Sequence, residues 1–207
     1  MIPPQSIRQF ATILSLNKTM EKPLSREGWE RFLGVLFLSL EENIMKISPK
    51  KLSLWGITAA VYVALTLLTA HFSFGPIQFR VAEALSVLCC FAPHMGVGIT
   101  LGCAIANIFS TVSLLDIVVG TLATAIACYL MGKCHRVWMM ILPNIFLNGI
   151  FVGGMLAFVL TPTAFWEGFM LYGAQVALGE ALVMILLGAP LYLLIQKSPR
   201  LQKTFLV

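Results

Sequence analysis

Charged side chains are scarce in this chain. Asp, Glu, Lys and Arg together account for 11% of the 207 residues, while hydrophobic residues account for 58%. Soluble globular domains carry roughly 25% charged residues, so this composition excludes an ordinary soluble domain. The sequence predicts instead a polytopic membrane protein of the all-α class.

Sequence signatures of several catalytic chemistries are also absent. The chain contains no Gly-x-x-x-x-Gly-Lys-Ser/Thr pattern, so any ATP dependence must come from partner subunits. It contains neither the H-E-x-x-H nor the Gly-x-Ser-x-Gly pattern of hydrolases. We therefore predict that the protein is not an enzyme, has no catalytic residues and carries no cofactor of its own.

The five cysteines and three histidines do not form a metal-binding pattern. No two cysteines are spaced as C-x-x-C, and their apolar surroundings favour buried thiols over a disulfide framework. The histidines fall in three different loops, so we predict no metal site. The residues concerned are Cys89, Cys90, Cys103, Cys128, Cys134, His71, His94 and His135.

Apolar windows of about 20 residues predict six membrane spans. The second span is short, and turn-forming residues such as Gly and Pro lie between spans. The expected spans are residues 52–70, 81–92, 95–112, 115–131, 137–160 and 169–195. The predicted architecture is therefore a bundle of six transmembrane helices.

Most basic residues fall in regions that six spans place on one side of the membrane. Of the 14 Lys and Arg residues, eight lie within residues 1–51 and three within residues 197–203, while Lys133 and Arg136 lie between the fourth and fifth spans. Cytoplasmic loops collect Lys and Arg. We therefore predict a multi-pass protein of the cell membrane with both termini cytoplasmic. The net charge of +5 reflects this orientation and gives no reason to expect nucleic-acid binding.

Arg80 breaks this pattern, because six spans place it on the opposite side. Glu83 follows three residues later, a spacing that puts both side chains on one helical face. An ionisable group inside a membrane is disfavoured by roughly 2.5 to 3.5 kcal/mol, which suggests that the pair has a use beyond folding. The pair either contributes to a ligand site or only neutralises itself.

Residues 1–44 differ from the rest because they mix polar and charged residues. Their apolar patch at residues 32–40 is too short to span a membrane. An amphipathic surface helix, an upstream start codon or an added segment would each account for this extension, to which we assign no function. The membrane domain is expected at residues 45–207.

Polar residues are few inside the predicted spans, and each could bind a ligand or only a neighbouring helix. Glu180 is hardest to dismiss, since a carboxylate deep in the sixth span must be protonated, paired with Arg80, or bound to a cationic or amide-bearing ligand. Asn144 and Asn148 lie one turn apart and face the same way. The candidate substrate-binding residues are Gln78, Arg80, Glu83, Asn107, Asp116, Asn144, Asn148 and Glu180.

Small residues recur at helical spacing in four predicted spans, where they allow close approach between helices. Such ridges fit internal packing more often than a partner interface. They are Gly56, Ala60 and Ala64; Gly98, Gly102 and Ala106; Gly149 and Gly153; and Gly173 and Ala177.

Several sequence blocks follow one another in a distinctive order. They are residues 78–88 (QFRVAEALSVL), 102–107 (GCAIAN), 116–124 (DIVVGTLAT), 143–149 (Pro-Asn, then Asn-Gly) and 177–180 (ALGE). In this succession, over roughly residues 50–195, the chain resembles the QueT family of queuosine-precursor transporters, which are substrate-binding S components of energy-coupling factor (ECF) transporters. Residues 1–44 have no recognised counterpart. The chain departs from the family pattern at residues 88–93, where the family usually has an earlier proline.

The resemblance implies a six-helix S component that captures its ligand outside the cell. The implied ligand is a 7-deazaguanine such as preQ1 or queuine. The implied partners are an ECF transmembrane scaffold subunit and two ATPase subunits, which hydrolyse the ATP. Family-like docking uses an alanine motif on the first helix, which Ala60 and Ala64 match, and this favours a partner interface for the ridge that also contains Gly56.

A guanine-like edge suits the candidate residues. Its adjacent N–H donors suit a carboxylate, which Glu180 or Glu83 would supply. Its carbonyl suits Arg80 or an asparagine of the fifth span, and Asp116 is a lesser candidate for a substituent amine.

Three alternatives remain open. An S component for another small nutrient would have the same architecture, because selectivity depends on local details of the site. A self-sufficient proton-coupled carrier would use Glu83 or Glu180 as a proton relay and would transport without ATPases. An intramembrane enzyme is disfavoured by the missing nucleophile or metal pattern.

Overall fold

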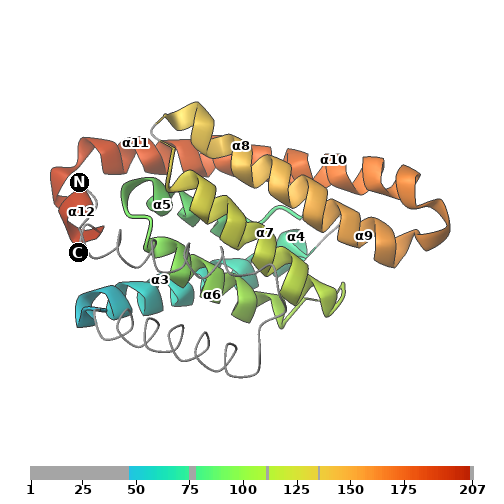
Figure 1. The fold of residues 1–207 in the computed structure, drawn as a ribbon, viewed down its shortest axis with the longest axis horizontal. Helices are drawn as coiled ribbons and strands as arrows, with labels where there is room; N and C mark the ends of the chain where they lie inside the picture. Colours follow the sequence, from blue (N-terminus) through green and yellow to red (C-terminus); the bar gives the residue numbers. More distant parts are fainter. Residues whose placement is uncertain (1–46, 75–77, 111, 135, 206–207) are drawn as a thin grey trace, which may run out of the picture. The chain divides into compact units, whose positions relative to one another are not determined.

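The computed structural model describes residues 47–205 except 75–77, 111 and 135, and the regular structure within these residues is helical (Figure 1). The extension expected at residues 1–44 lies outside the described residues. The first helices are α3 (Pro49–Leu68), α4 (Ala70–Ser73), the 3₁₀ helix η1 (Val81–Val87), α5 (Leu88–Phe91), α6 (Met95–Asn107) and α7 (Leu115–Met131). They are followed by α8 (Val137–Leu147), the π-helix η2 (Asn148–Val152), α9 (Gly153–Leu160), the 3₁₀ helix η3 (Pro162–Ala164), α10 (Phe165–Val183), the π-helix η4 (Met184–Gly188), α11 (Ala189–Lys197) and α12 (Pro199–Phe205).

Three helical stretches among the described residues are long and apolar enough to cross a membrane. They are Pro49–Leu68, Val137–Leu160 and Pro162–Lys197, the last two formed by several consecutive helices. Shorter apolar helices cover Val81–Phe91, Met95–Asn107 and Leu115–Met131. The chain is therefore a multi-pass membrane protein, and the regular structure of its described residues is helical. The number of crossings and the side of each terminus stay predictions.

Several predicted span boundaries were wrong. The first helix begins earlier than residue 52, because Ser48 caps it by accepting a hydrogen bond from the Lys51 N–H at 3.3 Å, with Pro49 at its first position. The third span ends at Asn107 instead of residue 112. The last stretch includes α10 from Phe165, so residues 165–168 are helical although they were expected in a loop.

Glycines bring α3 and α6 into close contact. A Cβ at Gly98 would lie 2.7 Å from the Trp55 carbonyl oxygen, and one at Gly102 would lie 2.7 Å from the Tyr62 Cβ. Gly153 of α9 likewise faces the backbone of Gly173 in α10, leaving no room for a side chain. The ridges on α6, α9 and α10 therefore serve internal packing, which is how transmembrane helices without a hydrophobic driving force gain contact.

Pro143 lies inside α8 and leaves one helical hydrogen bond unmade, because proline has no N–H to donate to the carbonyl of Met139, four residues earlier. The Cys134 thiol donates to that carbonyl at 3.3 Å. The π-helix η2 follows one turn after Pro143, and η4 directly precedes α11 with Pro190 in its first turn. Such local adjustments let membrane helices tolerate proline.

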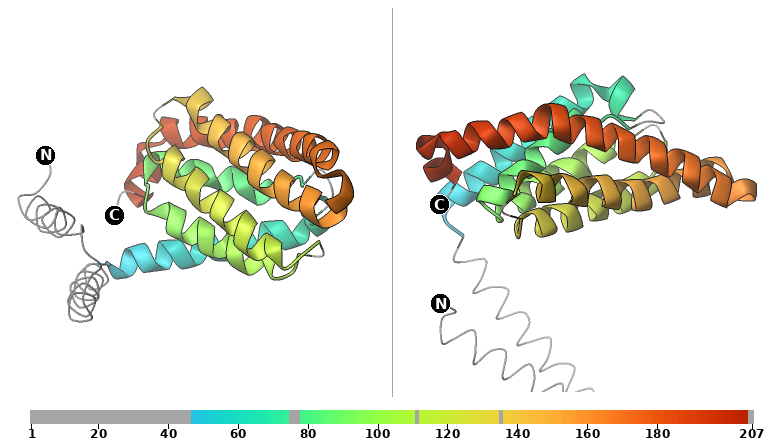
Figure 2. Two further views of the ribbon diagram at one scale, coloured as in Figure 1. Left: turned by 45° about the vertical axis from the view of Figure 1, so that its right-hand side comes forward. Right: turned by 90° about the horizontal axis from the view of Figure 1, so that it is seen from above.

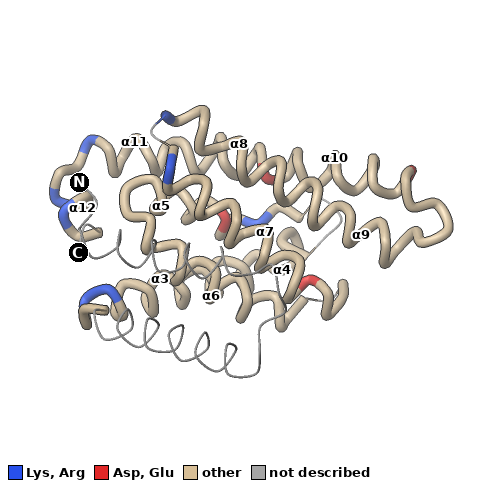
Figure 3. The backbone as a smooth tube through the Cα atoms, viewed as in Figure 1, with Lys and Arg blue, Asp and Glu red and all other residues tan. Residues whose placement is uncertain are grey.

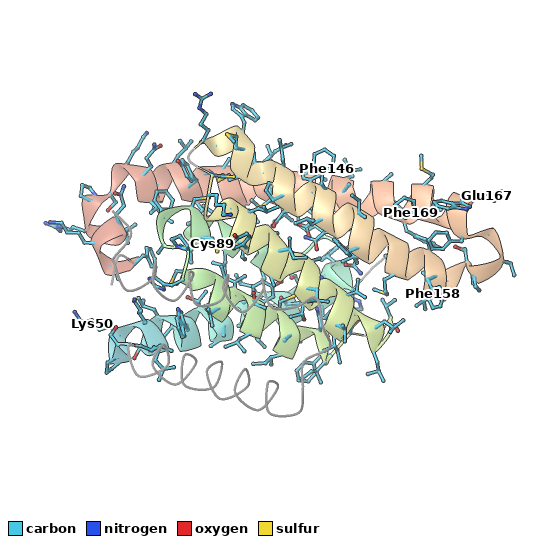
Figure 4. All side chains as sticks on the ribbon, viewed as in Figure 1. Lys50, Cys89, Phe146, Phe158, Glu167 and Phe169 are labelled. Atoms are coloured by element: carbon cyan, nitrogen blue, oxygen red, sulfur yellow. The ribbon has the colours of Figure 1, made fainter. Side chains whose placement is uncertain are left out.

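The unit formed by Ser48–Val207 is elongated, with α8–α9 and α10–α11 side by side along its length (Figures 1 and 2). Lys and Arg residues gather toward the end that carries α12 (Figure 3). Lys50 and Glu167 mark opposite ends (Figure 4). Basic segments far apart in the sequence thus lie together, as the predicted topology requires.

Candidate functional site

All eight candidate residues are buried, each at most 3% exposed. A buried polar group without a hydrogen bond is costly, so the partners of these residues decide what each can do. They come from the segment before η1 (Gln78, Arg80), η1 (Glu83), α6 (Asn107), α7 (Asp116), α8 (Asn144), η2 (Asn148) and α10 (Glu180).

One part of the site is built around an ion pair. Arg80 Nη2 donates to both carboxylate oxygens of Asp116, at 3.1 and 2.9 Å. Ser110 Oγ donates to Asp116 Oδ2 at 2.8 Å, and Asn107 Nδ2 donates to the Asp116 main-chain carbonyl at 3.0 Å. Asp116 also lies in the first turn of α7, where the helix dipole favours a negative charge. We call Arg80, Asp116, Ser110 and Asn107 the ion-pair half of the site.

The structure decides between alternatives for one pairing of Arg80 and corrects one expectation about it. The ion pair that it forms is with Asp116, 36 residues away in the sequence, and not with Glu180. It also shares no helical face with Glu83, because Arg80 precedes η1 with an extended backbone at φ −89° and ψ 92°. Local spacing cannot reveal a pair that depends on how α7 packs beside η1.

Glu83 accepts hydrogen bonds from three other helices. The Tyr62 hydroxyl on α3 and the Thr124 hydroxyl on α7 both donate to Oε1, the latter at 3.0 Å. Asn144 Nδ2 on α8 donates to Oε2 at 3.3 Å and to Ser86 Oγ at 3.1 Å. The sequence did not identify Tyr62, Ser86 or Thr124, because such residues are ordinary in membrane helices.

Other buried polar atoms have no hydrogen-bond partner among the described residues. Glu180 Oε2, Gln175 Oε1 and Asn144 Oδ1 are acceptors of this kind, and Asn148 Nδ2 is a donor. These four residues lie on α8, η2 and α10, which contact one another. We call Glu180, Gln175, Asn144 and Asn148 the open half of the site. Gln78 Nε2, Arg80 Nε, Asn107 Oδ1 and Thr121 Oγ1 also lack a partner.

Unpartnered buried polar atoms are rare in folded proteins, and each calls for an explanation. Six of the eight candidate residues carry one, which makes the site suited to a polar ligand. Gln175 and Thr121 were not among the candidates. Gln175 could have been identified from the sequence, because a glutamine is unusual in an apolar span. Thr121 could not, because threonine is ordinary there.

Gln78 positions Arg80 through a tight turn. Its φ of 45° lies in the left-handed region, which is uncommon for a residue other than glycine. The Arg80 N–H donates to the Gln78 carbonyl at 2.9 Å, and the Arg80 guanidinium lies 5.8 Å from the centre of the Phe74 ring. Backbone strain of this kind concentrates at functional sites.

The ridge on α3 faces outward. Gly56, Ala60 and Ala64 are exposed, and a Cβ at Gly56 would have no neighbour within 4 Å. The outward position separates this ridge from those of α6, α9 and α10, which pack inside the unit.

A multi-pass helical protein with polar residues gathered in its interior has the architecture of a membrane protein that handles a polar ligand. Among the described residues, no group of three or more His, Cys, Asp or Glu residues could hold a metal ion. The chain belongs to the QueT transporter family, whose sequence pattern matches residues 52–197. The resemblance noted from the sequence is thereby confirmed.

One curated relative is the "Queuosine precursor transporter QueT" of Lactococcus lactis subsp. cremoris (strain MG1363). It is 40% identical to this chain over 73 residues, which make up 34% of this chain and 43% of the relative. The match thus spans less than half of the relative's length. No solved structure matches the chain.

Proposed function

We propose that this protein is the substrate-binding S component of an ECF importer for a queuosine precursor, a 7-deazaguanine such as preQ1 or queuine. Membership of the QueT transporter family and the name of the Lactococcus relative support the substrate class. The observation that carries the proposal is the open half of the site, whose buried polar atoms have no hydrogen-bond partner among the described residues.

The open half offers what a guanine-like edge needs. Glu180 accepts the adjacent ring and exocyclic N–H donors, because a carboxylate has two oxygens at matching spacing. Asn148 Nδ2 donates to the ligand carbonyl, and Asn144 Oδ1 and Gln175 Oε1 accept from the remaining N–H groups. Glu83 has three donors already and serves mainly to hold Asn144 in place.

The ion-pair half closes the site beside the ligand. Arg80 keeps a free Nε for the ligand even though its Nη2 is engaged by Asp116. Asp116 is committed to three partners, so the role first considered for it, contact with a substituent amine, is a minor one.

Transport then requires partners that supply ATP hydrolysis. We place an ECF transmembrane scaffold subunit on the exposed ridge of Gly56, Ala60 and Ala64, where a helix can approach the α3 backbone closely. Two ATPase subunits drive the scaffold from the cytoplasm. The protein itself is expected in the cell membrane with both termini cytoplasmic.

Calorimetry on the purified full chain tests the proposal. PreQ1, queuine and guanine are titrated, with riboflavin and thiamine as controls. Tight binding of a deazaguanine alone supports the assignment. Binding of a control vitamin points to an S component for another nutrient, and uptake of a deazaguanine by cells that lack the ATPases points to a self-sufficient carrier.

A charge-reversing variant tests the site within the same assay. Glu180→Lys places a cation where the ligand's N–H donors should bind, so binding should be abolished while the protein still inserts. Wild-type affinity in this variant would contradict the role of Glu180.

A further inference from the structure

The helix α3 has two faces with different surroundings. Tyr62 is fully buried, and its Cβ lies against Gly102 of α6. Ala60 and Ala64 are each two residues away, a rotation of roughly 200° around the helix, and both are exposed. One helix therefore carries the outward ridge on one face and a residue of the buried polar network on the other.

Tyr62 is the residue through which α3 enters this network. Its hydroxyl donates to Glu83 Oε1, an oxygen that also accepts from Thr124 of α7. Glu83 Oε2 accepts from Asn144, whose own Oδ1 lacks a partner and belongs to the open half. Asn144 thus connects the Tyr62–Glu83 hydrogen bond to the open half of the site.

The element that carries Glu83 is suited to rearrangement. It is a 3₁₀ helix of seven residues, whereas 3₁₀ runs longer than three or four residues are uncommon and often mark hinges. Within this helix the Ser86 hydroxyl donates to the Glu83 main-chain carbonyl. Ser86 and Glu83 therefore contribute both to the backbone conformation of η1 and to the buried polar network. A ligand that engages Asn144 changes the hydrogen bonds that Glu83 makes on this segment, and Tyr62 is positioned to pass that change to α3.

We infer that Tyr62 couples occupancy of the buried site to the position of α3, and hence to docking at the ridge of Gly56, Ala60 and Ala64. In the arrangement seen here the Tyr62 hydroxyl binds Glu83. When a ligand binds Asn144, the Asn144–Glu83 hydrogen bond rearranges, the Tyr62–Glu83 hydrogen bond weakens and α3 shifts against α6. Coupling between two sites requires a contact that differs between the ligand-free and the ligand-bound state, and the Tyr62–Glu83 hydrogen bond is that contact. The inference rests on the function proposed above and adds to it the residue that links the buried site to the ridge.

The test compares two variants that each remove one donor from the same oxygen of Glu83. Tyr62→Phe removes the donor on α3, and Thr124→Val removes the donor on α7. For each full-length protein in nanodiscs, the affinity for the purified scaffold–ATPase complex is measured with and without saturating preQ1. The ratio of the two affinities reports the coupling.

Wild type should show a ratio that differs from one by roughly fivefold or more, in either direction. Both variants should still bind preQ1 within roughly tenfold of the wild-type affinity, since each loses only one hydrogen bond to Glu83, which holds Asn144 in place. Only Tyr62→Phe should bring the ratio to one, and Thr124→Val should keep the wild-type ratio. Three results would overturn the inference. The first is a ratio in Tyr62→Phe equal to that of wild type, and the second is a ratio of one in the wild-type protein itself. The third is a ratio of one in both variants.

A second measurement covers the case in which Tyr62→Phe does not fold. Hydrogen exchange of the wild-type α3 amides should change when preQ1 binds, while those of α9 should not, and unchanged α3 exchange would overturn the inference. Failure of the proposed function is distinguishable, because wild type itself would then bind no deazaguanine or would not dock. In that outcome the inference falls together with the function.

Discussion

The two halves of the buried site differ in how their charges are compensated. In the ion-pair half, Asp116 is surrounded by donors from Arg80, Asn107 and Ser110. In the open half, Glu180 Oε2 has no donor among the described residues. The comparison teaches that similar burial hides two different states: the Asp116 carboxylate is saturated by donors from other segments, whereas the Glu180 carboxylate has an unpartnered oxygen, which we propose accepts from a ligand.

Removing one member of the ion pair should have the largest effect on stability. Arg80→Leu leaves Asp116 buried without its cation, which should lower the free energy of unfolding by roughly 3–5 kcal/mol. Denaturant titration of the purified protein measures the loss. The double variant Arg80→Leu/Asp116→Leu should be less destabilised than the single one, and a single variant as stable as wild type would show that the two halves do not differ in this way.

Neutralising Glu180 should affect binding more than folding. Glu180→Gln removes a charge-assisted hydrogen bond of roughly 1.5–3 kcal/mol, so the preQ1 affinity should fall by about 10- to 150-fold. Calorimetry measures the fall, and denaturation should show stability no lower than that of wild type. The matched control is Glu167→Gln, an exposed residue at one end of the unit, which should leave both quantities unchanged (Figure 4). A purely structural Glu180 would reverse the result, with stability lost and affinity kept.

Crowding the ion-pair half should destabilise the fold by a smaller amount. A Cβ at Gly120 would lie 2.8 Å from Asn107 Nδ2 and 2.9 Å from Asp116 Oδ1, so Gly120→Ala should cost roughly 1–3 kcal/mol by overpacking. Thermal unfolding measures this cost. Gly56→Ala is the control, because a Cβ there meets nothing within 4 Å, and equal effects of the two changes would contradict the packing argument.

The smallest effect is expected at the edge of the open half. Gln175→Leu removes an unpartnered acceptor, Oε1, which should lower the preQ1 affinity by about fivefold, equivalent to roughly 1 kcal/mol. Stability should rise slightly, since a buried polar atom without a partner is removed. An unchanged affinity would take Gln175 out of the open half.

Much of the helical pattern was predictable because apolar length is a local property. The expected spans at residues 115–131 and 137–160 match α7 and the stretch from α8 to α9. The 3₁₀ form of η1 and the early start of α10 were not predicted. Hydropathy does not distinguish one kind of helix from another, and aromatic residues such as Trp166 fit a loop as well as a helix end.

Burial of the eight candidate residues was also predictable, because charged and amide side chains in an apolar chain stand out, whereas hydroxyl groups such as those of Tyr62 and Thr124 do not. The pairing of the candidate residues was not predictable. Arg80 pairs with Asp116, and Glu83 binds Tyr62 and Thr124, across sequence separations of 21 to 41 residues. Such contacts depend on which helices pack together.

The sequence by itself determined that this protein crosses a membrane, that it belongs to the QueT transporter family, and which polar residues its interior must accommodate. Hydropathy and composition decide the first and third points, since transfer into lipid acts on each residue separately, whereas the ordered sequence blocks decide the family. Only the tertiary structure decided which charges are paired, which polar atoms are left for a ligand, and which face of α3 is exposed. These depend on distances between helices, and a hydrogen bond or an ion pair forms only when two side chains meet at the right separation.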